Sequence, residues 1–282
     1  MVIGTLWRGN SMLSPRAGSR ISRWPIVRQW RAPARRFHAF GLGSAKSGTH
    51  SIAAIFQNSY SSAHEAEHAK MISAILQRSE RSLPDAAVRR WLLRRDRRLG
   101  LELDSSQLNA SFADLLPDLF PEARFILTIR DCYSFLESVI DHQLSRPDSP
   151  DWRQMRALRF GGFEYQPQEQ ALIRRGLYPL AGYLSYWARH NQHVLDCIPS
   201  ERLLVVRTTE IADSIHQIAH FLEIDPESID ITQCHAYPAK QRFGVLSQID
   251  HDFIEHQVAT YCSSIMNQFF PQVCGAAQFA AA

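Results

Sequence analysis

The stretch FGLGSAKSGTHSIAAIF, residues 40–56, contains the residue types that bind phosphate-like anions. An apolar segment leads into a loop of small residues around Lys46, and an apolar helix-like segment follows. The first N–H groups of a helix have no acceptor within it and carry the positive end of its dipole, so such a loop can hold an anion. Backbone donors, with hydroxyl groups beside them, are expected from Ser47, Gly48, Thr49, His50 and Ser51.

The position of the lysine separates this loop from the loop that binds nucleoside triphosphates. Gly43 and Gly48 have the glycine spacing of the GxxxxGK[ST] motif. Thr49 and His50, however, stand where that motif places its lysine and its Mg²⁺-binding hydroxyl. Lys46 precedes the last glycine and can instead face an oxygen that bridges two anionic groups.

A second motif, LTIRDCYSFLESVIDH, places Arg130 at the end of an apolar segment and Ser138 one to two turns into the next helix. Ligands of open α/β sheets bind at the carboxyl ends of the strands, so Arg130 is expected beside the lysine loop. A guanidinium and a hydroxyl together bind a phosphate well. Taken alone, the motif is equally compatible with Arg130 pairing with Asp131 or a helix end, and with Ser138 facing solvent.

The elements that must position these residues form an α/β pattern. Four apolar segments are predicted as strands of a central parallel sheet because helix-like stretches separate them. They are residues 37–42, 99–103, 124–129 and 202–206. Helices are predicted over residues 49–58, 110–119 with Pro117 as a bend or an early end, 134–144, 177–198, 209–224 and 250–269. Asp104, Ser105 and Ser106 follow the second strand at the expected ligand edge, without an assigned role.

Residues 145–176 interrupt this pattern with prolines and glycines, and a connection of this length is typical of a substrate lid. Its aromatic and basic side chains suit a sugar, an aryl group or an anionic acceptor, although packing explains at least half of them. They are Trp152, Arg153, Arg156, Arg159, Phe160, Phe163 and Tyr165. The predicted domain covers residues 37–272, and residues 273–282 are expected to fray.

Residues 1–63 contain no Asp or Glu, and residues 1–36 are predicted to form a basic, poorly ordered extension. A transit peptide has a similar composition, and contact with an acidic partner is the alternative. The five cysteines are scattered and show no zinc or disulfide spacing, which favours a reducing, cytoplasmic location and no metal. The net charge of +3 does not indicate nucleic-acid binding, and no apolar run of about 18 residues predicts a transmembrane segment.

Together, the two motifs resemble those of the sulfotransferases that use 3′-phosphoadenosine 5′-phosphosulfate (PAPS). KSGTHS is similar to that family's 5′-phosphosulfate loop, and RDCYSFLES is similar to its 3′-phosphate segment, with Arg130 and Ser138 at the matching positions. RLLVVRTTEIADSIHQIAHFLEI resembles the closing strand and helix, so the likeness spans residues 37–270. The resemblance implies a P-loop NTPase-like sulfotransferase fold. It also implies transfer of a sulfuryl group to a hydroxyl or amine, with adenosine 3′,5′-bisphosphate (PAP) as product.

The sequence departs from the family's pattern at several positions. Cys132 replaces the proline that often follows the RD pair, and His50 with Ser51 replaces the usual Thr or aromatic residue. The RKG triplet of the cytosolic animal enzymes is absent, and Lys240 and Arg242 are the nearest basic substitutes. These differences indicate a bacterial or carbohydrate-type branch.

Sulfuryl transfer needs a cation on the leaving oxygen and a base for the acceptor's proton. Lys46 has the type required of the cation. The segment SSAHEAEHAK concentrates histidine and glutamate after the first helix, where carbohydrate-type relatives often carry a catalytic glutamate. Glu65 is therefore the predicted base and His64 the second candidate, with Glu67 and His142 left open. The alternative is that this segment is an exposed polar turn without a catalytic role.

Two other functions are compatible with the fold. A P-loop kinase or nucleotide hydrolase needs the lysine after the last glycine, which this chain lacks. A non-catalytic binding module on the same fold has no need of Lys46, Arg130 and Ser138, although their presence does not exclude it. The sequence does not identify the small-molecule or carbohydrate acceptor, and it indicates no oligomeric state.

Overall fold

The computed structural model describes residues 34–146, 149–234, 241–273 and 275. The chain divides into two units, residues 1–32, which lie outside the described part, and residues 33–282. The second unit is an α/β domain. Within the described residues, no helix has the length and apolar character needed to cross a membrane.

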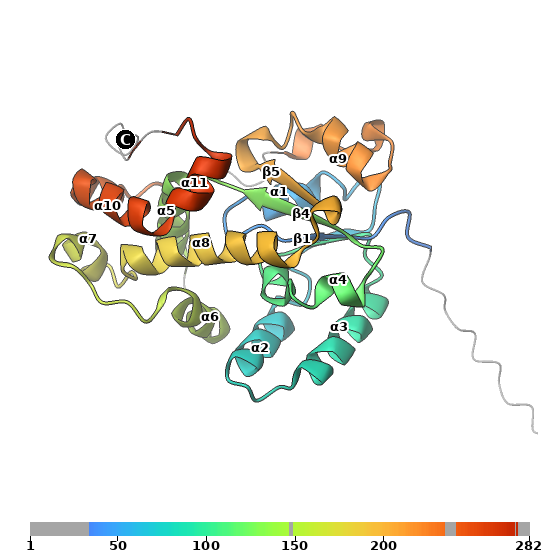
Figure 1. Ribbon diagram of the computed structural model, residues 1–282, viewed down its shortest axis with the longest axis horizontal. Coiled ribbons are helices and arrows are strands. Elements are labelled where there is room, and N and C mark those ends of the chain that lie inside the picture. Colours follow the sequence, from blue (N-terminus) through green and yellow to red (C-terminus); the bar gives the residue numbers. More distant parts are fainter. Residues whose placement is uncertain (1–33, 147–148, 235–240, 274, 276–282) are drawn as a thin grey trace, which may run out of the picture. The chain divides into compact units, whose positions relative to one another are not determined.

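A parallel sheet of five strands forms the centre of the domain, in the order β2-β3-β1-β4-β5 (Figure 1). The strands are β1 (Ala39–Gly41), β2 (Ser62–His64), β3 (Leu103–Ser105), β4 (Arg124–Ile129) and β5 (Leu203–Arg207). The predicted α/β class with a central parallel sheet is therefore confirmed. The chain builds outward in both directions from β1, which lies between β3 and β4. The carboxyl end of β1 is thus the topological switch point at which such sheets bind ligands.

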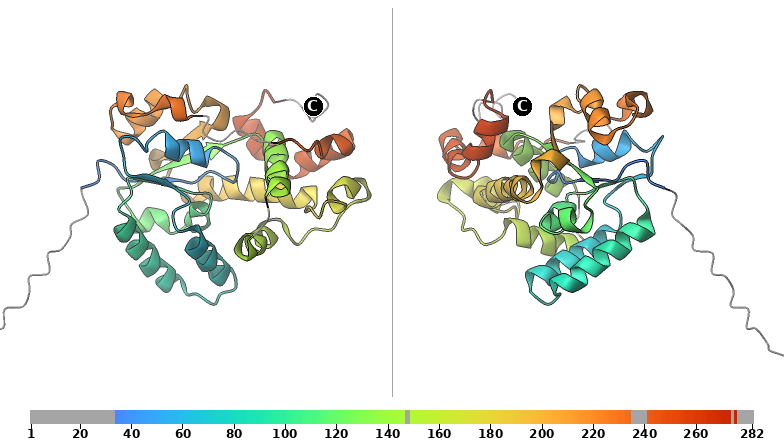
Figure 2. Two further views of the ribbon diagram at one scale, coloured as in Figure 1. Left: turned by 180° about the vertical axis from the view of Figure 1, so that it is seen from behind. Right: turned by 45° about the vertical axis from the view of Figure 1, so that its right-hand side comes forward.

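Helices cover both faces of the sheet, as its alternating buried residues require. Ile126 of β4 packs with α1 (Thr49–Ala54) and α9 (Ile215–Leu222) on one face. Its neighbours Phe125 and Leu127 pack on the opposite face. That face is covered by α2 (His68–Ser79), α3 (Asp85–Leu99), α4 (Leu116–Leu119) and the end of α8 (Leu180–Cys197) (Figure 2).

A second core forms around α8, whose Trp187 and Tyr183 are fully buried. It includes α5 (Cys132–Ser145), α6 (Pro150–Phe160), α7 (Gln170–Ile173), α10 (His251–Tyr261) and α11 (Ser263–Phe269). Short 3₁₀ helices occupy Asn109–Phe112, Pro167–Glu169, Ser200–Arg202, Thr208–Glu210, Pro226–Ser228, Ile231–Gln233 and Leu246–Gln248. Helix α8 contributes to this core and to the core on the sheet face that α2 and α3 cover. It therefore connects the group of helices to the sheet.

The region between the first helix and β3 differs from the prediction. The strand predicted over residues 99–103 corresponds to β3, which begins only at Leu103. Helix α3 continues to Leu99 and ends at Gly100, which has φ +61°. Helices α2 and α3 and the edge strand β2 were not predicted. Three residues of α3 are buried, and one of them is Arg95, so its hydrophobic periodicity is weak.

Four other segments are more broken than predicted. The first helix ends at Ala54 as an α-helix, and the helix expected over residues 110–119 is a 3₁₀ turn followed by α4, which has Pro117 in its first turn. The final helix divides at Cys262 into α10 and α11. The connection over residues 145–176 contains α6 and α7, and its function as a lid stays a prediction.

Candidate active site

The register of the sheet places the predicted site residues at one edge. His64, Ser105 and Gly41 are aligned across β2, β3 and β1, each as the last residue of its strand. Because the strands are parallel, the segments that follow them emerge at the same edge. The loop after β1 carries Lys46, and Glu65 follows β2. Strand β4 extends three residues beyond the position opposite Gly41, to Ile129.

Two glycines permit the conformation of the lysine loop. A Cβ atom on Gly43 would lie 2.0 Å from Oγ1 of Thr128 on β4. Gly48, which precedes α1, has φ +97°, and Lys46 has φ +63°. The Ser47 hydroxyl donates to the Ser44 carbonyl oxygen at 2.8 Å and is fully buried. The expectation that this hydroxyl is a donor for an anion is therefore wrong, since it stabilises the loop from within.

Side chains from the surrounding elements hold the backbone of the loop. His190 Nε2 donates to the Leu42 carbonyl oxygen at 2.8 Å. Arg130 Nη1 donates to the Lys46 carbonyl oxygen at 3.2 Å, and Thr208 Oγ1 donates to the Ser47 carbonyl oxygen at 2.6 Å. In a trans peptide, the carbonyl of one residue and the N–H of the next point in opposite directions. With the Ser47 carbonyl directed at Thr208, the N–H of Gly48 is directed to the opposite side.

Two histidines and a glutamate lie within electrostatic range of Lys46. The rings of His50 and His64 have centroids 4.9 Å apart, and His64 Nε2 lies 3.2 Å from the Thr49 hydroxyl. Burial lowers the pKa of both imidazoles, the charge of Glu65 opposes this effect, and Lys46 reinforces it. Both rings are therefore neutral at neutral pH.

The carboxylate of Glu65 is oriented by one donor. Gln107 Nε2, after β3, donates to Glu65 Oε1 at 2.6 Å. Among the residues that the structure describes, no donor contacts Oε2. Glu67 differs, because it hydrogen bonds with Lys70 and Arg98, and the bond to Lys70 lowers its pKa. Glu67 is thus held by cations and has a structural role.

His142 on α5 is a further neutral imidazole near Lys46. Burial lowers the pKa of His142 to about 4, and the charges of Lys46, Arg146 and Arg156 act in the same direction. His68 is placed differently, since its ring stacks on Trp152 of α6 with centroids 6.3 Å apart. His142 therefore remains a candidate base, whereas His68 packs against α6.

Arg130, Ser138 and Arg242 are the described residues predicted to bind a phosphate near β4 and α5. Ser138 is 9% exposed, so the alternative in which it faces solvent is wrong. Arg242 Nη1 lies 3.9 Å from the carboxylate of Glu137, the neighbour of Ser138. Burial lowers the pKa of Arg130, the charges of Asp131 and Glu137 oppose this effect, and the charge of Arg242 reinforces it. Asp131 caps α5 by accepting from the Ser134 N–H at 2.9 Å. Lys240 lies outside the described residues.

The family model described as "Sulfotransferase domain" matches residues 38–241. The chain belongs to the sulfotransferase family. It is therefore an enzyme of sulfuryl transfer with the P-loop-like α/β fold of that family.

The comparison with solved structures gives two sulfotransferases with low similarity to this chain. One is the sulfotransferase from Alicyclobacillus acidocaldarius, with 15% identity, a TM-score of 0.46, and coverage of 82% of this chain and 96% of that chain. Another is the sulfotransferase domain from the curacin biosynthetic pathway, with 11% identity, a TM-score of 0.34, and coverage of 77% and 84%. No curated protein sequence matches this sulfotransferase.

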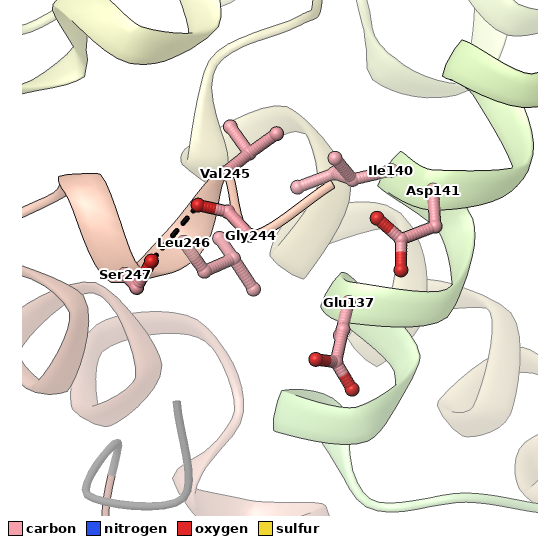
Figure 3. Close-up of a pocket in the computed structure, with 7 residues that line it drawn as sticks. All are labelled: Glu137, Ile140, Asp141, Gly244, Val245, Leu246 and Ser247. Atoms are coloured by element: carbon pink, nitrogen blue, oxygen red, sulfur yellow. Dashed lines mark hydrogen bonds between the residues drawn. The ribbon is translucent and has the colours of Figure 1, made fainter. Parts of the chain in front are cut away.

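A small pocket lies beside the phosphate residues, between α5 and the segment 244–247 (Figure 3). Its α5 side carries Glu137 and Asp141. Burial raises the pKa of Asp141, which accepts from the Phe243 N–H at 3.1 Å. Two carboxyl groups make this pocket unsuitable for an anion, so a phosphate is expected on the Arg130 side of α5.

The polar residues at the end of β3 support the site without contacting its centre. Asp104 forms a buried ion pair with Arg95 of α3. The Ser105 hydroxyl donates to the Thr49 carbonyl at 2.7 Å, and the Ser106 hydroxyl accepts from the Leu108 N–H at 3.1 Å. The bond from Ser105 to Thr49 holds the start of α1 against β3, and the ion pair with Arg95 holds α3 against β3.

Sequence reasoning missed four residues that contact the site: Gln107, Thr208, Trp187 and His190. Thr208 follows the last strand at the ligand edge, so the rule that identified Arg130 could have found it. The other three belong to no motif. Among the described residues, no group of three His, Cys, Asp or Glu side chains could hold a metal ion.

Proposed function

We propose that this sulfotransferase moves a sulfuryl group from PAPS to a hydroxyl or amine of a small-molecule or carbohydrate acceptor. The observation that carries the proposal is the contact between Arg130 and the Lys46 carbonyl at 3.2 Å. It joins two cationic regions, the lysine loop and the group of Arg130, Ser138 and Arg242. A ligand with a phosphosulfate at one end of a nucleoside and a phosphate at the other suits this pair of regions.

The lysine loop would bind the phosphosulfate. Backbone N–H groups from Gly48 to Ser51 are the donors, since the Ser47 N–H donates to the Ser44 carbonyl at 3.3 Å. The restrained carbonyls keep these donors in place before binding. The hydroxyls of Thr49 and Ser51 can add to them. Lys46 would stabilise the negative charge that develops on the oxygen joining sulfur to the leaving phosphate.

Arg130 and Ser138 would hold the 3′-phosphate, with Arg242 and Lys240 as further cationic contacts. The guanidinium of Arg130 offers several donors in a fixed planar geometry that matches phosphate oxygens. Burial restricts its movement, and the Trp187 indole N–H holds its carbonyl oxygen at 2.9 Å.

Glu65 would accept the proton of the acceptor. As the acceptor oxygen or nitrogen bonds to sulfur, the bond from sulfur to the phosphate oxygen breaks, and the phosphate keeps the electron pair. The acceptor's proton passes to the carboxylate of Glu65, whose Oε2 is not engaged by the described residues. His64 and His142 are neutral and are the remaining candidates for this base.

The donor assignment can be tested by calorimetry with PAP, and with ATP plus Mg²⁺ as the competing ligand. We expect PAP to bind at least 10-fold more tightly than adenosine 5′-phosphate. ATP with Mg²⁺ should bind no more tightly than adenosine 5′-phosphate. Tighter binding of ATP with Mg²⁺ would instead support a kinase or nucleotide hydrolase.

Turnover separates an enzyme from a binding module. Release of PAP from PAPS, with water as the acceptor, should fall about 100-fold or more in Lys46→Ala, because the leaving oxygen loses its cation. Lys70→Ala, on an exposed side chain of α2, is the matched control and should retain the rate. Equal rates in wild type and Lys46→Ala would contradict the assigned role.

A further inference from the structure

Three side chains from distant parts of the sequence form a continuous hydrogen-bonded network at the acceptor side of the site. Gln107 Nε2 donates to Glu65 Oε1 at 2.6 Å, and Arg159 Nη1 donates to Gln107 Oε1 at 2.6 Å. Glu65 follows β2, Gln107 follows β3, and Arg159 lies in the last turn of α6. The network therefore connects two strand ends to a helix of the predicted lid.

The chemistry of the two outer groups fixes the orientation of the amide. A guanidinium can only donate hydrogen bonds, so the oxygen of Gln107 must face Arg159. The amide nitrogen then faces Glu65, which accepts from it as an ionised carboxylate. If the amide were reversed, its NH₂ group would face the guanidinium, so that two donors meet. Its oxygen would face the carboxylate, so that two acceptors meet.

Arg159 is held in place by packing as well as by charge. It is 8% exposed, and its guanidinium lies 5.1 Å from the ring centroid of Tyr186 and 6.0 Å from that of Trp152. Arg189 of α8 donates to its carbonyl oxygen at 3.3 Å. A charged side chain buried in this way has little freedom, so it provides a fixed end for the network.

We propose that Gln107 and Arg159 are positioning residues that hold Oε1 of Glu65 and leave Oε2 available to accept the acceptor's proton. This inference rests on the proposed function, in which Glu65 is the base. A guanidinium in direct contact would bind both carboxylate oxygens and stabilise the anion strongly, which would weaken it as a base. The amide of Gln107 instead binds one carboxylate oxygen of Glu65, and the guanidinium of Arg159 acts on that carboxylate only from a distance.

The position of α6 is coupled to the base through this network. Displacement of the last turn of α6 would remove Arg159 from Gln107, and the amide that orients the carboxylate would lose its fixed partner. The other charged or titratable groups that act with Glu65 are His50 on α1, His64 on β2 and Tyr186 on α8. Among the described residues, Gln107 is the donor whose bond fixes the direction of Oε1.

The network can be observed without turnover, from the side-chain amide of Gln107 in ¹H–¹⁵N spectra of the whole protein. In the wild type, we expect the proton that faces Glu65 to resonate downfield and to exchange slowly with solvent. Glu65→Ala and Arg159→Met should each remove both features. Unchanged Gln107 amide signals in these two variants would overturn the inference.

The kinetic test uses PAP release from PAPS with water as the acceptor. Gln107→Leu and Arg159→Met should each lower kcat about 10- to 100-fold, since small misplacement of a reacting group has effects of this size. The KM for PAPS and the Kd of PAP should stay within about 2-fold.

Two further variants separate positioning from packing. Gln107→Met fills a similar space but neither accepts from Arg159 nor donates to Glu65, so it should be as slow as Gln107→Leu. A packing role predicts instead that Gln107→Met keeps the wild-type rate. Gln77→Leu, on the exposed surface of α2, is the control and should retain kcat and the KM for PAPS.

The outcomes distinguish this inference from the proposed function. If Glu65→Ala abolishes turnover while Gln107→Leu retains it, Glu65 remains the base and the positioning role is wrong. If Glu65→Ala retains turnover, Glu65 is not the base and both statements fail. If PAP does not bind to the wild type, the proposed donor is wrong.

Discussion

The guanidinium of Arg130 donates from Nη1 to the carbonyl oxygen of Lys46 at 3.2 Å. The residue expected to hold one end of the donor nucleotide therefore also holds the loop expected to bind the other end. The Arg130 carbonyl in turn accepts from the Trp187 indole at 2.9 Å, which fixes the start of α5 relative to α8. Substitution of Arg130 should consequently affect both ends of the bound nucleotide.

Arg130→Met should weaken binding of PAP about 100-fold and binding of adenosine 5′-phosphate about 10-fold. The larger effect reflects lost charge-assisted hydrogen bonds to the 3′-phosphate, each contributing roughly 1.5–3 kcal/mol. The smaller effect reflects a loop that has lost one restraint. Calorimetry with both ligands measures the two effects.

Arg124→Met is the matched control for this experiment. Arg124 lies at the start of the same strand, β4, and pairs with Glu223. It should leave both affinities unchanged. An equal loss of affinity for PAP and adenosine 5′-phosphate in Arg130→Met would show that Arg130 acts only on the loop.

Gly43→Ala should abolish detectable PAP binding. The added Cβ would lie 2.0 Å from Thr128 Oγ1 and 2.8 Å from the Thr128 carbonyl oxygen, so the loop has to leave β4. Gly176→Ala is the control, because Gly176 has φ +63° but no atom within 4 Å of an added Cβ. It should lower stability by about 1 kcal/mol and leave PAP binding unchanged. PAP binding by Gly43→Ala at wild-type affinity would contradict the assignment of the loop.

The position of Lys46 and Arg130 at one edge of the sheet could be predicted from the sequence because the signals are local. Gly43, Lys46 and Gly48 lie within one short loop between a strand and a helix, and Arg130 directly follows an apolar strand. Parallel strands place such residues at one edge whatever their register. The family resemblance rests on these same residues.

The arrangement around Glu65 could not be predicted, because it depends on pairing between strands. Strand β2 has three half-buried residues with no apolar alternation, so nothing in the sequence marks it as a strand. Its register with β3 places Glu65 beside Ser105, whose carbonyl accepts from the Glu65 N–H at 3.0 Å. Arg159 reaches Gln107 across 52 residues of sequence through the packing of α6, and no local pattern records this contact.

Acid should destabilise the protein through His190, which is buried against the lysine loop. Burial lowers its pKa to about 3 in the folded protein, against about 6.5 in the unfolded chain. The unfolded state therefore binds more protons as pH falls from about 6.5 toward about 3, and folding stability is lost over that range. Between pH 7 and pH 5, this residue should remove about 2 kcal/mol from the free energy of unfolding.

His190→Gln tests this contribution, since its amide can still donate to the Leu42 carbonyl but does not titrate. Urea denaturation of both proteins at pH 7 and pH 5 gives the comparison. The variant should lose less stability than the wild type on acidification, by about 2 kcal/mol. The same pH dependence in both proteins would show that His190 is not responsible.

The buried ion pair of Arg95 and Asp104 should contribute to stability only as a pair. Their side chains are 3% and 6% exposed, and among the described residues Oδ1 of Asp104 has no hydrogen-bond partner. Arg95→Met leaves a buried carboxylate without its cation and should cost about 3–5 kcal/mol. The double variant Arg95→Met with Asp104→Leu removes both charges and should recover most of that loss, because neither charge then has to be desolvated. The free energies of unfolding from urea titration give the comparison.

Arg89→Met, which breaks an exposed pair with Asp118, is the control and should cost less than about 1 kcal/mol. If the double variant is as unstable as Arg95→Met, the cost comes from the lost bond between Arg95 and the Ala66 carbonyl and from packing, not from the unpaired charge.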